Sequence, residues 1–332
     1  MIIQSANNPA DWDHFLIAQP WSPFLQSWTM GEVYREIGQE PIRLELRDEE
    51  KIVGICQAII VPARRGRHMM VQYGPVISNI RYQTSDIRSL VEELKKIAKK
   101  KGCSFIRISP FWPKEQKLEI PGATRSPMHL LAEHIWFLNL EGKTEEEIFK
   151  GMRATTRNLI RRAEKEGVTI HKSPDIDVFL RLHQQTHKRH HFTPYTDAFF
   201  QTQFSKFAPE HCTLYVATYQ HKPIAASIHM HFGGETSYHH GASSFEYSKI
   251  PASYLLQWRA IQDALIRGDH IYNFWGISPS NAKKHPFAGV TTFKTGFGGE
   301  LLELTPCMDI PLSARYYFTK SFELLRKWKR GF

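Results

Sequence analysis

The side chains best suited to chemistry in this sequence are cations that recur at helical spacing. Arg153, Arg157, Arg161 and Lys165 are four residues apart, and Arg162 lies beside them. Residues four apart share one face of an α-helix, so these side chains form a basic stripe. A stripe of cations without interleaved acids suits a phosphate backbone, and we predict that it binds nucleic acid. A solvated face and a membrane surface are the alternatives.

The stripe needs a helix to display it, and the sequence predicts one between residues 144 and 167. Thr144 and Glu147 match the S/T-x-x-E capping box that begins a helix. Gly167 is the residue type that ends one. The apolar residues of its predicted buried face are Ile148, Met152, Leu159 and Ala163.

Histidines form the second group with chemical potential. His187, His190 and His191 have the spacing of one helical face, and His229 and His231 would share one face of a strand. A zinc site needs converging ligands, usually with a cysteine or carboxylate partner. Because no HExxH motif is present, we expect no metal, and we assign the histidines to binding surfaces or to structure.

Composition limits the class of protein. The 332 residues carry 43 Lys and Arg against 33 Asp and Glu, a net charge of +10. This charge fits nucleic acid, an anionic membrane or a phosphorylated small molecule as partner, and also an ordinary basic surface. The four cysteines form no CxxC pair. We therefore expect a reducing cytoplasm, and we find neither a signal peptide nor an apolar stretch of membrane-spanning length.

A repeated order of elements indicates two related domains. The first half has alternating or apolar strand patterns at 42–46, 52–61, 69–77 and 103–108, with a helical pattern at 87–97 before the last of them. The second half repeats the order with strands at 213–219, 224–232, 236–240 and 270–275, and a helix through 255–265. Gly102 and Gly268 follow the two helices as caps. Duplication is the natural interpretation, and chance similarity of a common motif is the alternative.

Four segments then resemble one family in the right order. They are Phe24-Leu25-Gln26-Ser27-Trp28, the helix from Met152 to Val168, Tyr272-Asn273-Phe274-Trp275-Gly276, and Phe293-Lys294-Thr295-Gly296-Phe297-Gly298-Gly299-Glu300. They resemble motifs of the FemABX family of aminoacyl-tRNA-dependent peptidyltransferases, which build the interpeptide bridges of peptidoglycan. The last segment, which resembles the family's FKxgFGGe pattern, is the most specific.

The resemblance implies a fold and a reaction. The fold class is α/β (mixed α+β), with two tandem GNAT-like domains, related to GCN5-type acyltransferases. The chain resembles the compact type without a coiled-coil arm. We expect residues 1–138 with a returning helix at 315–332 to form the first domain, and residues 139–314 to form the second. The resemblance implies transfer of an amino acid from aminoacyl-tRNA to an amine of a peptidoglycan-precursor peptide, carried by UDP (UDP-MurNAc-pentapeptide) or by lipid.

The resemblance also assigns the site. Lys294 falls where the family has its FK pair, and we expect it to stabilise the developing oxyanion or to contact the terminal adenosine phosphates, with Phe293 shaping the site. For the precursor we expect Arg189, Tyr195 and Tyr73. An aminoacyl ester is already activated, so no cofactor is expected. The basic stripe is assigned to the tRNA.

The sequence departs from the family pattern at three places. Tyr34, followed by Arg35, stands where the family commonly has a lysine, so the precursor contact shifts to these residues or is lost. Ser109 and Asn273 stand where acids are common. Because these replacements weaken the case for a side-chain general base, deprotonation by the substrate itself and a different acceptor remain open.

Other functions remain as alternatives. An acyl-CoA-dependent enzyme would carry glycines in a pyrophosphate loop before a helix, and Ser248-Lys249-Ile250-Pro251-Ala252 has none. A related transferase with a non-muropeptide acceptor and an inactive relative that only binds its ligand are the others. The segment from Ala314 to Arg330 is amphipathic, with Phe318, Phe322 and Leu325 on one side. It could pack on the first domain or make a peripheral contact with an anionic membrane. The sequence does not predict an oligomeric state.

Overall fold

The computed structural model describes residues 2–63, 66–78, 84–117, 119–190, 195–279 and 285–330, without the side chains of residues 84–85, 187–190 and 330. The chain divides into two compact units, Met1–Glu133 with Glu303–Phe332, and His134–Leu302. The boundaries expected from the sequence, after residues 138 and 314, lie 5 and 12 residues later than these. Two short strands account for the difference.

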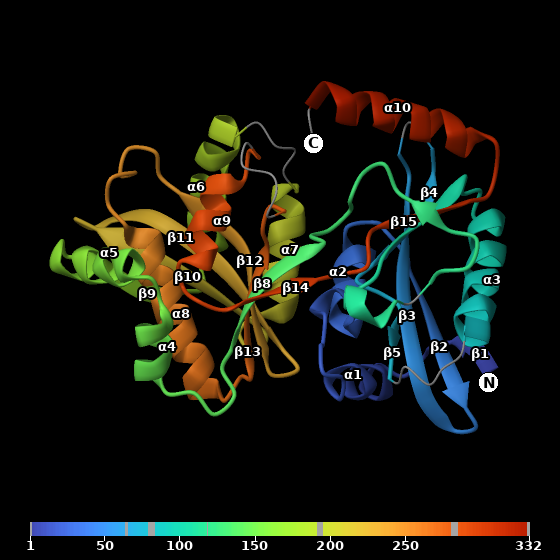
Figure 1. Ribbon diagram of the computed structural model, residues 1–332, viewed down its shortest axis with the longest axis horizontal. Helices are drawn as coiled ribbons and strands as arrows, with labels where there is room; N and C mark the ends of the chain where they lie inside the picture. Colours follow the sequence, from blue (N-terminus) through green and yellow to red (C-terminus); the bar gives the residue numbers. More distant parts are fainter. Residues whose placement is uncertain are drawn as a thin grey trace. The chain divides into compact units, whose positions relative to one another are not determined.

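The first unit is a mixed sheet with helices packed against it (Figure 1). Its strands are β1 (Ile2–Ser5), β2 (Pro41–Asp48), β3 (Lys51–Val61), β4 (His68–Gln72), β5 (Val76–Ile77), β6 (Phe105–Ser109), β7 (Thr124–Arg125) and β15 (Met308–Pro311). Its helices are α1 (Pro9–Ile17), α2 (Trp28–Glu36), α3 (Thr84–Lys100) and α10 (Arg315–Arg330), with short 3-10 turns at Phe24–Gln26 and Lys114–Gln116.

The second unit repeats this plan. Its strands are β8 (His134–Asn139), β9 (Thr169–Ser173), β10 (Cys212–Tyr219), β11 (Lys222–Phe232), β12 (Glu235–Ser243), β13 (Ile271–Gly276) and β14 (Glu300–Glu303). Its helices are α4 (Glu145–Gly151), α5 (Ala154–Lys165), α6 (Ile176–His190), α7 (Asp197–Phe207), α8 (Ala252–Arg267) and α9 (Ala288–Thr295).

The two sheets have the same strand order. The first runs β1-β2-β3-β4-β6-β15-β7, and the second, in the matching direction, runs β9-β10-β11-β12-β13-β8-β14. In the first sheet β4 and β6 are parallel, and α3 lies between them in the chain. In the second, β12 and β13 are parallel, and α8 lies between them in the chain. This shared order supports duplication and confirms the predicted mixed α/β fold class.

The strand that follows each half of the chain belongs to the sheet of the other half. β8 follows the first half of the chain, yet it pairs antiparallel with β13 in the second sheet. β15 follows the second half, yet it pairs antiparallel with β6 in the first sheet. Strand pairing therefore places residues 134–139 in the second unit and residues 308–311 in the first.

The predicted helix from 144 to 167 is in fact two helices, so this prediction was wrong. The capping box of Thr144 and Glu147 begins α4 as expected. The chain then becomes extended at Met152, whose ψ is 153°, and α5 begins after Arg153. Met152 is buried, and the N–H of Arg153 donates to the carbonyl of Gly296 at 2.9 Å. A tertiary contact thus interrupts a continuous helical pattern.

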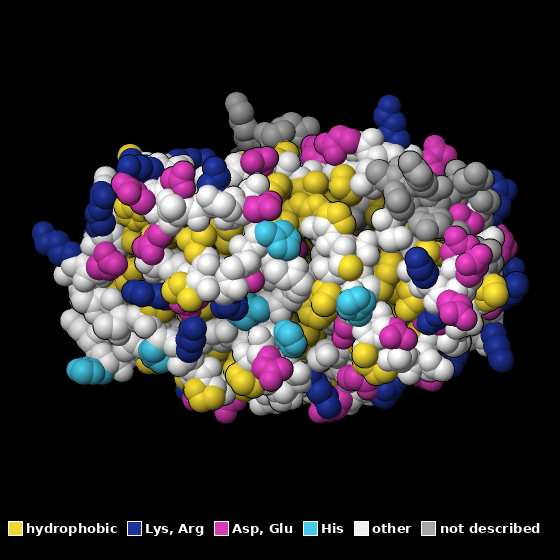
Figure 2. All heavy atoms as spheres, turned by 90° about the horizontal axis from the view of Figure 1, so that it is seen from below, with side chains coloured by type: hydrophobic (Ala, Val, Ile, Leu, Met, Phe, Trp, Pro, Cys, Tyr) yellow, Lys and Arg dark blue, Asp and Glu magenta, His cyan; other side chains and the backbone are white. Residues whose placement is uncertain are grey.

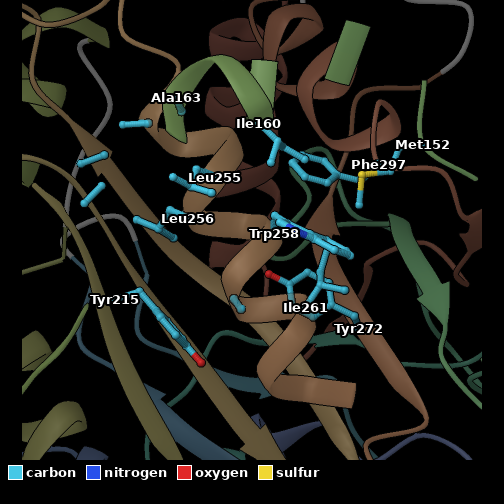
Figure 3. Packing of buried hydrophobic residues seen from close by; sticks show 14 of the residues in the cluster. Met152, Ile160, Ala163, Tyr215, Leu255, Leu256, Trp258, Ile261, Tyr272 and Phe297 are labelled. Atoms are coloured by element: carbon cyan, nitrogen blue, oxygen red, sulfur yellow. The ribbon is translucent and has the colours of Figure 1, made fainter. Parts of the chain in front are cut away.

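Apolar side chains from both helices enter the core of the second unit. Met152 of the linker and Ile160 of α5 pack in one buried cluster with Trp258 of α8 and Phe297, and Figure 3 shows these side chains facing one another. Burial of this cluster fixes where α5 lies against α8. The first unit has its own buried cluster, which includes Leu44, Val71, Leu90 and Ile108. No helix in the described parts of the chain has the length and hydropathy needed to span a bilayer.

Candidate active site

A cavity of the second unit lies where α8 begins. It has a volume of about 620 Å³ and is bordered by β11, β12, the start of α8, and side chains of α5 and α9. Many of its lining side chains carry hydroxyl groups, among them Ser227, Tyr238, Ser243 and Ser248. Lys249 is the single charged side chain among the described lining residues. The cavity therefore suits an uncharged group bound beside one cation.

Phe293 and Lys294 of α9 lie at this cavity, on different sides of its wall. The ring of Phe293 lines the cavity and packs edge-on against Tyr254, with 4.9 Å between ring centroids. Lys294 is buried, and its Nζ donates a hydrogen bond to the carbonyl of Gly276 at 2.7 Å. That Nζ lies 5.6 Å from the ring centroid of Tyr238, which lines the cavity. Lys294 thus lies behind the wall formed by Tyr238.

Burial sets the protonation of Lys294. Removing an ammonium from water disfavours its charged form, and this lowers the pKa of Lys294 to about 7. The amine is therefore divided between its charged and neutral forms near neutral pH. Burial also raises the pKa of the Tyr238 hydroxyl to about 12, so that tyrosine stays protonated.

The glycines after Lys294 are required by close packing. A Cβ at residue 296 would lie 2.4 Å from Thr156 Oγ1, and one at residue 299 would lie 2.2 Å from the carbonyl oxygen of Phe137. Gly299 also has a φ of +100°, which side chains rarely adopt. The segment after α9 is thereby pressed against α5 and β8, and this explains in physical terms why the most specific motif of the sequence is rich in glycine.

A hydrogen-bonded chain runs from the cavity wall through buried side chains and back to the wall. Ser227 Oγ lies 3.4 Å from Nδ1 of His229, and Nε2 of that ring lies 2.8 Å from the hydroxyl of Tyr272. The tyrosine hydroxyl donates to Oε1 of Gln257 at 2.8 Å. With that donation, the tyrosine oxygen accepts the Nε2 proton, so Nδ1 is the acceptor for the serine hydroxyl. Burial lowers the pKa of His229 to about 3, which keeps the ring neutral.

Sequence reasoning missed most of this chain. Only the pairing of His229 and His231 on one strand face was noticed, and those two rings do face the same way. Both ends of the chain, Ser227 and Gln257, line the cavity. The available signal was the run of polar residues at every second position of a strand that is otherwise apolar.

Asn273, which replaces the acid expected in its strand, has a structural role. Its Nδ2 donates to Glu235 Oε1 at 2.8 Å, and its Oδ1 accepts the N–H of Trp275 at 2.7 Å. Trp275 has a φ of +67°, so this second bond holds an unfavourable backbone conformation. Glu235 is buried, and burial raises its pKa.

The basic stripe lies on α5 and just before it, and its cations differ in how firmly they are held. Arg153 donates to Thr295 Oγ1 at 2.7 Å, and Arg157 donates to the carbonyls of Lys150 and Met152. Arg162 pairs with Glu166 and reaches the carbonyl of Lys249, a residue of the cavity lining. The remaining two cations, Arg161 and Lys165, are exposed. Arg161 lies over the ring of Phe149.

The side chains expected to hold the precursor are not gathered at this cavity. Tyr34 is buried in the first unit and its hydroxyl bonds Gln72, while Arg35 is exposed and pairs with Glu32. Tyr73 is 1% exposed and donates to the carbonyl of Ala132.

The other two expected precursor contacts belong to the second unit. Tyr195 is exposed and stacks on Phe199. Arg189 falls outside the described side chains, as do His187, His190 and His191.

A smaller cavity of about 380 Å³ lies in the first unit. Aromatic side chains form much of it, including Trp21, Phe111 and Trp112. Tyr73 packs edge-on against Phe111 with 4.9 Å between centroids, so it supports this wall from behind.

Two repeated units, each with one parallel strand pair joined through a helix, define a tandem acyltransferase-like fold. Comparison with solved structures agrees with that class. A structure described as "Crystal structure of FemX" superposes with a TM-score of 0.81 at 17% identity, covering 97% of this chain and 100% of that one. A tandem GNAT protein from the clavulanic acid biosynthesis pathway gives a TM-score of 0.59 at 11% identity, covering 94% and 98%.

Sequence comparison gives the family. The FemAB family model matches residues 8–126, 122–222 and 217–323. Aminoacyltransferase FemA of Staphylococcus epidermidis is 20% identical over 417 aligned positions, covering 95% of this chain and 99% of the relative. The same enzyme of Staphylococcus aureus (strain MRSA252) is 20% identical, covering 95% and 96%. The chain belongs to the FemAB family, and the resemblance noted in the sequence is confirmed.

Proposed function

We propose that this protein is an aminoacyltransferase that moves an amino acid from aminoacyl-tRNA to an amine of a peptidoglycan-precursor peptide, in the synthesis of interpeptide bridges. Membership of the FemAB family and full-length similarity to enzymes named aminoacyltransferase FemA support the reaction class. The observation that carries the proposal to particular residues is the buried Lys294 behind the Tyr238 wall of the 620 Å³ cavity.

The reaction needs few groups from the protein. The acceptor amine attacks the ester carbonyl, a C–N bond forms, and the C–O bond to the terminal ribose breaks. The amine loses a proton and the ribose hydroxyl gains one. Because the ester is already activated, the enzyme acts by positioning and by stabilising negative charge on the carbonyl oxygen. In this proposal Lys294 supplies that positive charge, and Phe293 holds the aminoacyl end in the cavity.

The tRNA is proposed to approach along α5. The stripe residues Arg153, Arg157, Arg161, Arg162 and Lys165 would contact its backbone. Arg162 bonds the carbonyl of Lys249 at 3.1 Å, which links the stripe to the cavity lining. The first turn of α8 also lines the cavity, and the N-terminus of a helix favours a phosphate. We propose that the stripe and the cavity together receive the acceptor end of a tRNA.

We propose precursor contacts within each unit separately, and the UDP-linked and lipid-linked forms both remain candidates. Among the first-unit residues expected to contact the precursor, Arg35 is the exposed cation, and it is the candidate for a phosphate contact. Tyr34 and Tyr73 are buried, so their proposed part is to shape the site. Arg189 and Tyr195 stay proposals for the same ligand. We place the reaction in the cytoplasm, where aminoacyl-tRNA is found.

A transfer assay tests the proposal. Purified protein is mixed with a pool of radiolabelled aminoacyl-tRNAs and, separately, with UDP-linked and lipid-linked muropeptides. We expect label on one muropeptide and its loss in Lys294→Met, with Lys143→Met, an exposed lysine of the same unit, as the matched control. Transfer with acetyl-CoA in place of tRNA, or tRNA binding without transfer to either muropeptide, would overturn the proposed reaction.

The tRNA contact has its own test. Arg161→Gln removes one exposed cation of the stripe. We expect the slope of log K against log salt for tRNA binding to fall by about one unit, because roughly one fewer counterion is released. Arg267→Gln, at the end of α8, is the control, since Arg267 is paired with Asp269 away from the stripe. An unchanged slope in Arg161→Gln would remove α5 from the tRNA surface.

A further inference from the structure

The helix α10 exposes the side chains that an amphipathic helix usually buries. Phe318 is 80% exposed, Trp328 is 78% and Tyr317 is 60%. Leu324 and Leu325 are each 49% exposed. Figure 1 shows α10 as a helix that runs along the outside of its unit. Single exposed apolar residues are common, but these five on one helix, with Phe322 at 40%, form a patch that calls for a partner.

The opposite side of α10 is the side that holds it to the first unit. Tyr316 and Thr319 are buried there, and the ring of Tyr316 packs 5.3 Å from that of Phe105. Glu323 pairs with the buried Arg107 of β6, which also pairs with Asp309 of β15. Of the two alternatives that the sequence leaves open, packing of this helix on the first unit is therefore confirmed, and Phe318 and Leu325 stay exposed.

Helical geometry separates the two faces cleanly. At roughly 100° per residue, Tyr317, Phe318, Leu324, Leu325 and Trp328 fall within about 120° of the circumference, and Tyr316, Thr319 and Glu323 lie opposite them. The exposure of the first group is thus a property of the whole face and does not come from frayed ends.

Cations accompany the apolar face. The described cationic side chains of α10 are Arg315, Lys320, Arg326, Lys327 and Lys329. The single acid of the helix, Glu323, is neutralised by its pair with Arg107. In contrast, the face of the molecule drawn in Figure 2 shows Lys and Arg interspersed with Asp and Glu. At roughly 100° per residue, Lys320 and Lys329 fall within about 40° of the two edges of the apolar face, so positive charge flanks it.

We propose that α10 is an interfacial helix that docks this protein on an anionic lipid surface. Aromatic and leucine side chains on one face with lysine and arginine beside them match the interfacial boundary of a bilayer, where rings enter the acyl region and cations meet lipid phosphates. Trp328 and Tyr317 have the amphipathic rings that prefer this depth. The inference is independent of the reaction proposed above, although a lipid-linked acceptor would lie at the same surface.

Vesicle sedimentation of the full chain tests the inference. We expect binding to vesicles of phosphatidylcholine with phosphatidylglycerol, weaker binding to phosphatidylcholine alone, and release by salt. The variant Phe318→Glu/Leu325→Glu/Trp328→Glu should bind at least about tenfold more weakly, because three apolar groups are replaced by charges that the lipid repels. Ile266→Glu, at an 84% exposed position on α8, is the matched control and should bind as the wild type does.

The other occupants of this face predict different results. If the face covers another part of the chain, the triple variant lowers the unfolding midpoint and leaves vesicle binding unchanged. If it joins two copies, the wild type forms a dimer in sedimentation equilibrium that the triple variant loses, again without lipid binding. Either result overturns the inference.

The proposed reaction is tested separately. Transfer to a UDP-linked muropeptide in the absence of lipid should be the same in the triple variant and the wild type. If the wild type transfers the amino acid but does not bind vesicles, only the membrane inference is overturned. If it binds vesicles but transfers nothing, only the proposed reaction is overturned.

Discussion

Replacing Lys294 by methionine should stabilise the protein at acidic pH while it abolishes transfer. The side chain is 7% exposed, and the hydrogen bond to Gly276 is the polar contact that the structure gives its Nζ. Burial lowers its pKa from 10.5 to about 7. A charged ammonium in this place therefore weakens the fold, and methionine removes that charge while keeping a similar length.

The pH window follows from the direction of the shift. Below about pH 7 the amine is charged in both states and the folded state carries the full desolvation cost. Between about 7 and 10.5 the unfolded state binds more protons, so stability rises with pH. At about 1.4 kcal/mol per pKa unit, the shift corresponds to roughly 5 kcal/mol across the window. Loss of the bond to Gly276 offsets about 1 kcal/mol of the gain.

Urea unfolding of wild type and Lys294→Met at several pH values between 6 and 10 measures the difference. We expect the variant to be more stable by roughly 4 kcal/mol at pH 6, with the advantage shrinking toward pH 10 and reversing there. Lys143→Met, at an exposed position, should show a flat difference over the same range. A pH-independent difference for Lys294→Met would refute the reasoning, because it would mean that the amine is solvated when charged.

Two further substitutions test the packing around the cavity. Gly296→Ala should destabilise the protein by about 1–3 kcal/mol, because its Cβ would lie 2.4 Å from Thr156 Oγ1, and Thr156→Ala added to it should recover much of the loss in a double-mutant cycle; an additive pair would contradict this. Tyr272→Phe should cost about 1–3 kcal/mol in denaturant unfolding, because it leaves His229 and Gln257 without their shared partner. That loss should be the same at pH 6 and pH 8, since the imidazole is already neutral, and a loss that grows toward pH 6 would show that it titrates.

Local patterns predicted most elements of the fold, because alternation and helical spacing depend only on neighbouring residues. The capping box at Thr144 and the glycine cap at Gly268 were both predicted and are both present. The sheet to which a strand belongs could not be predicted this way. β8 and β15 were not predicted, and the strands with which they pair lie 130 or more residues away in the chain. The break at Met152 was missed for the same reason, since it depends on a bond to Gly296.

The candidate site likewise contains residues that the sequence predicted and residues that it did not. Resemblance pointed to Phe293 and Lys294, and the structure adds the cavity beside them. The chain from Ser227 to Gln257 stayed hidden because its hydrogen bonds join three separate elements, β11, β13 and α8. No pattern within one segment reports such a contact. The sequence therefore predicted the residues that lie in a motif of the family, and it did not predict those that only the fold brings together.

The glycine segment after α9 explains how the cation and the basic stripe are positioned together. Gly296 lies two residues after Lys294, its carbonyl accepts the N–H of Arg153, and its Cα faces Thr156 of α5. Arg153 itself returns a side-chain bond to Thr295 at 2.7 Å. The start of the proposed tRNA-binding helix is thus fixed by the same few residues that carry the proposed catalytic lysine. A shift of this segment would move both, so binding of the donor and stabilisation of the oxyanion are expected to weaken together.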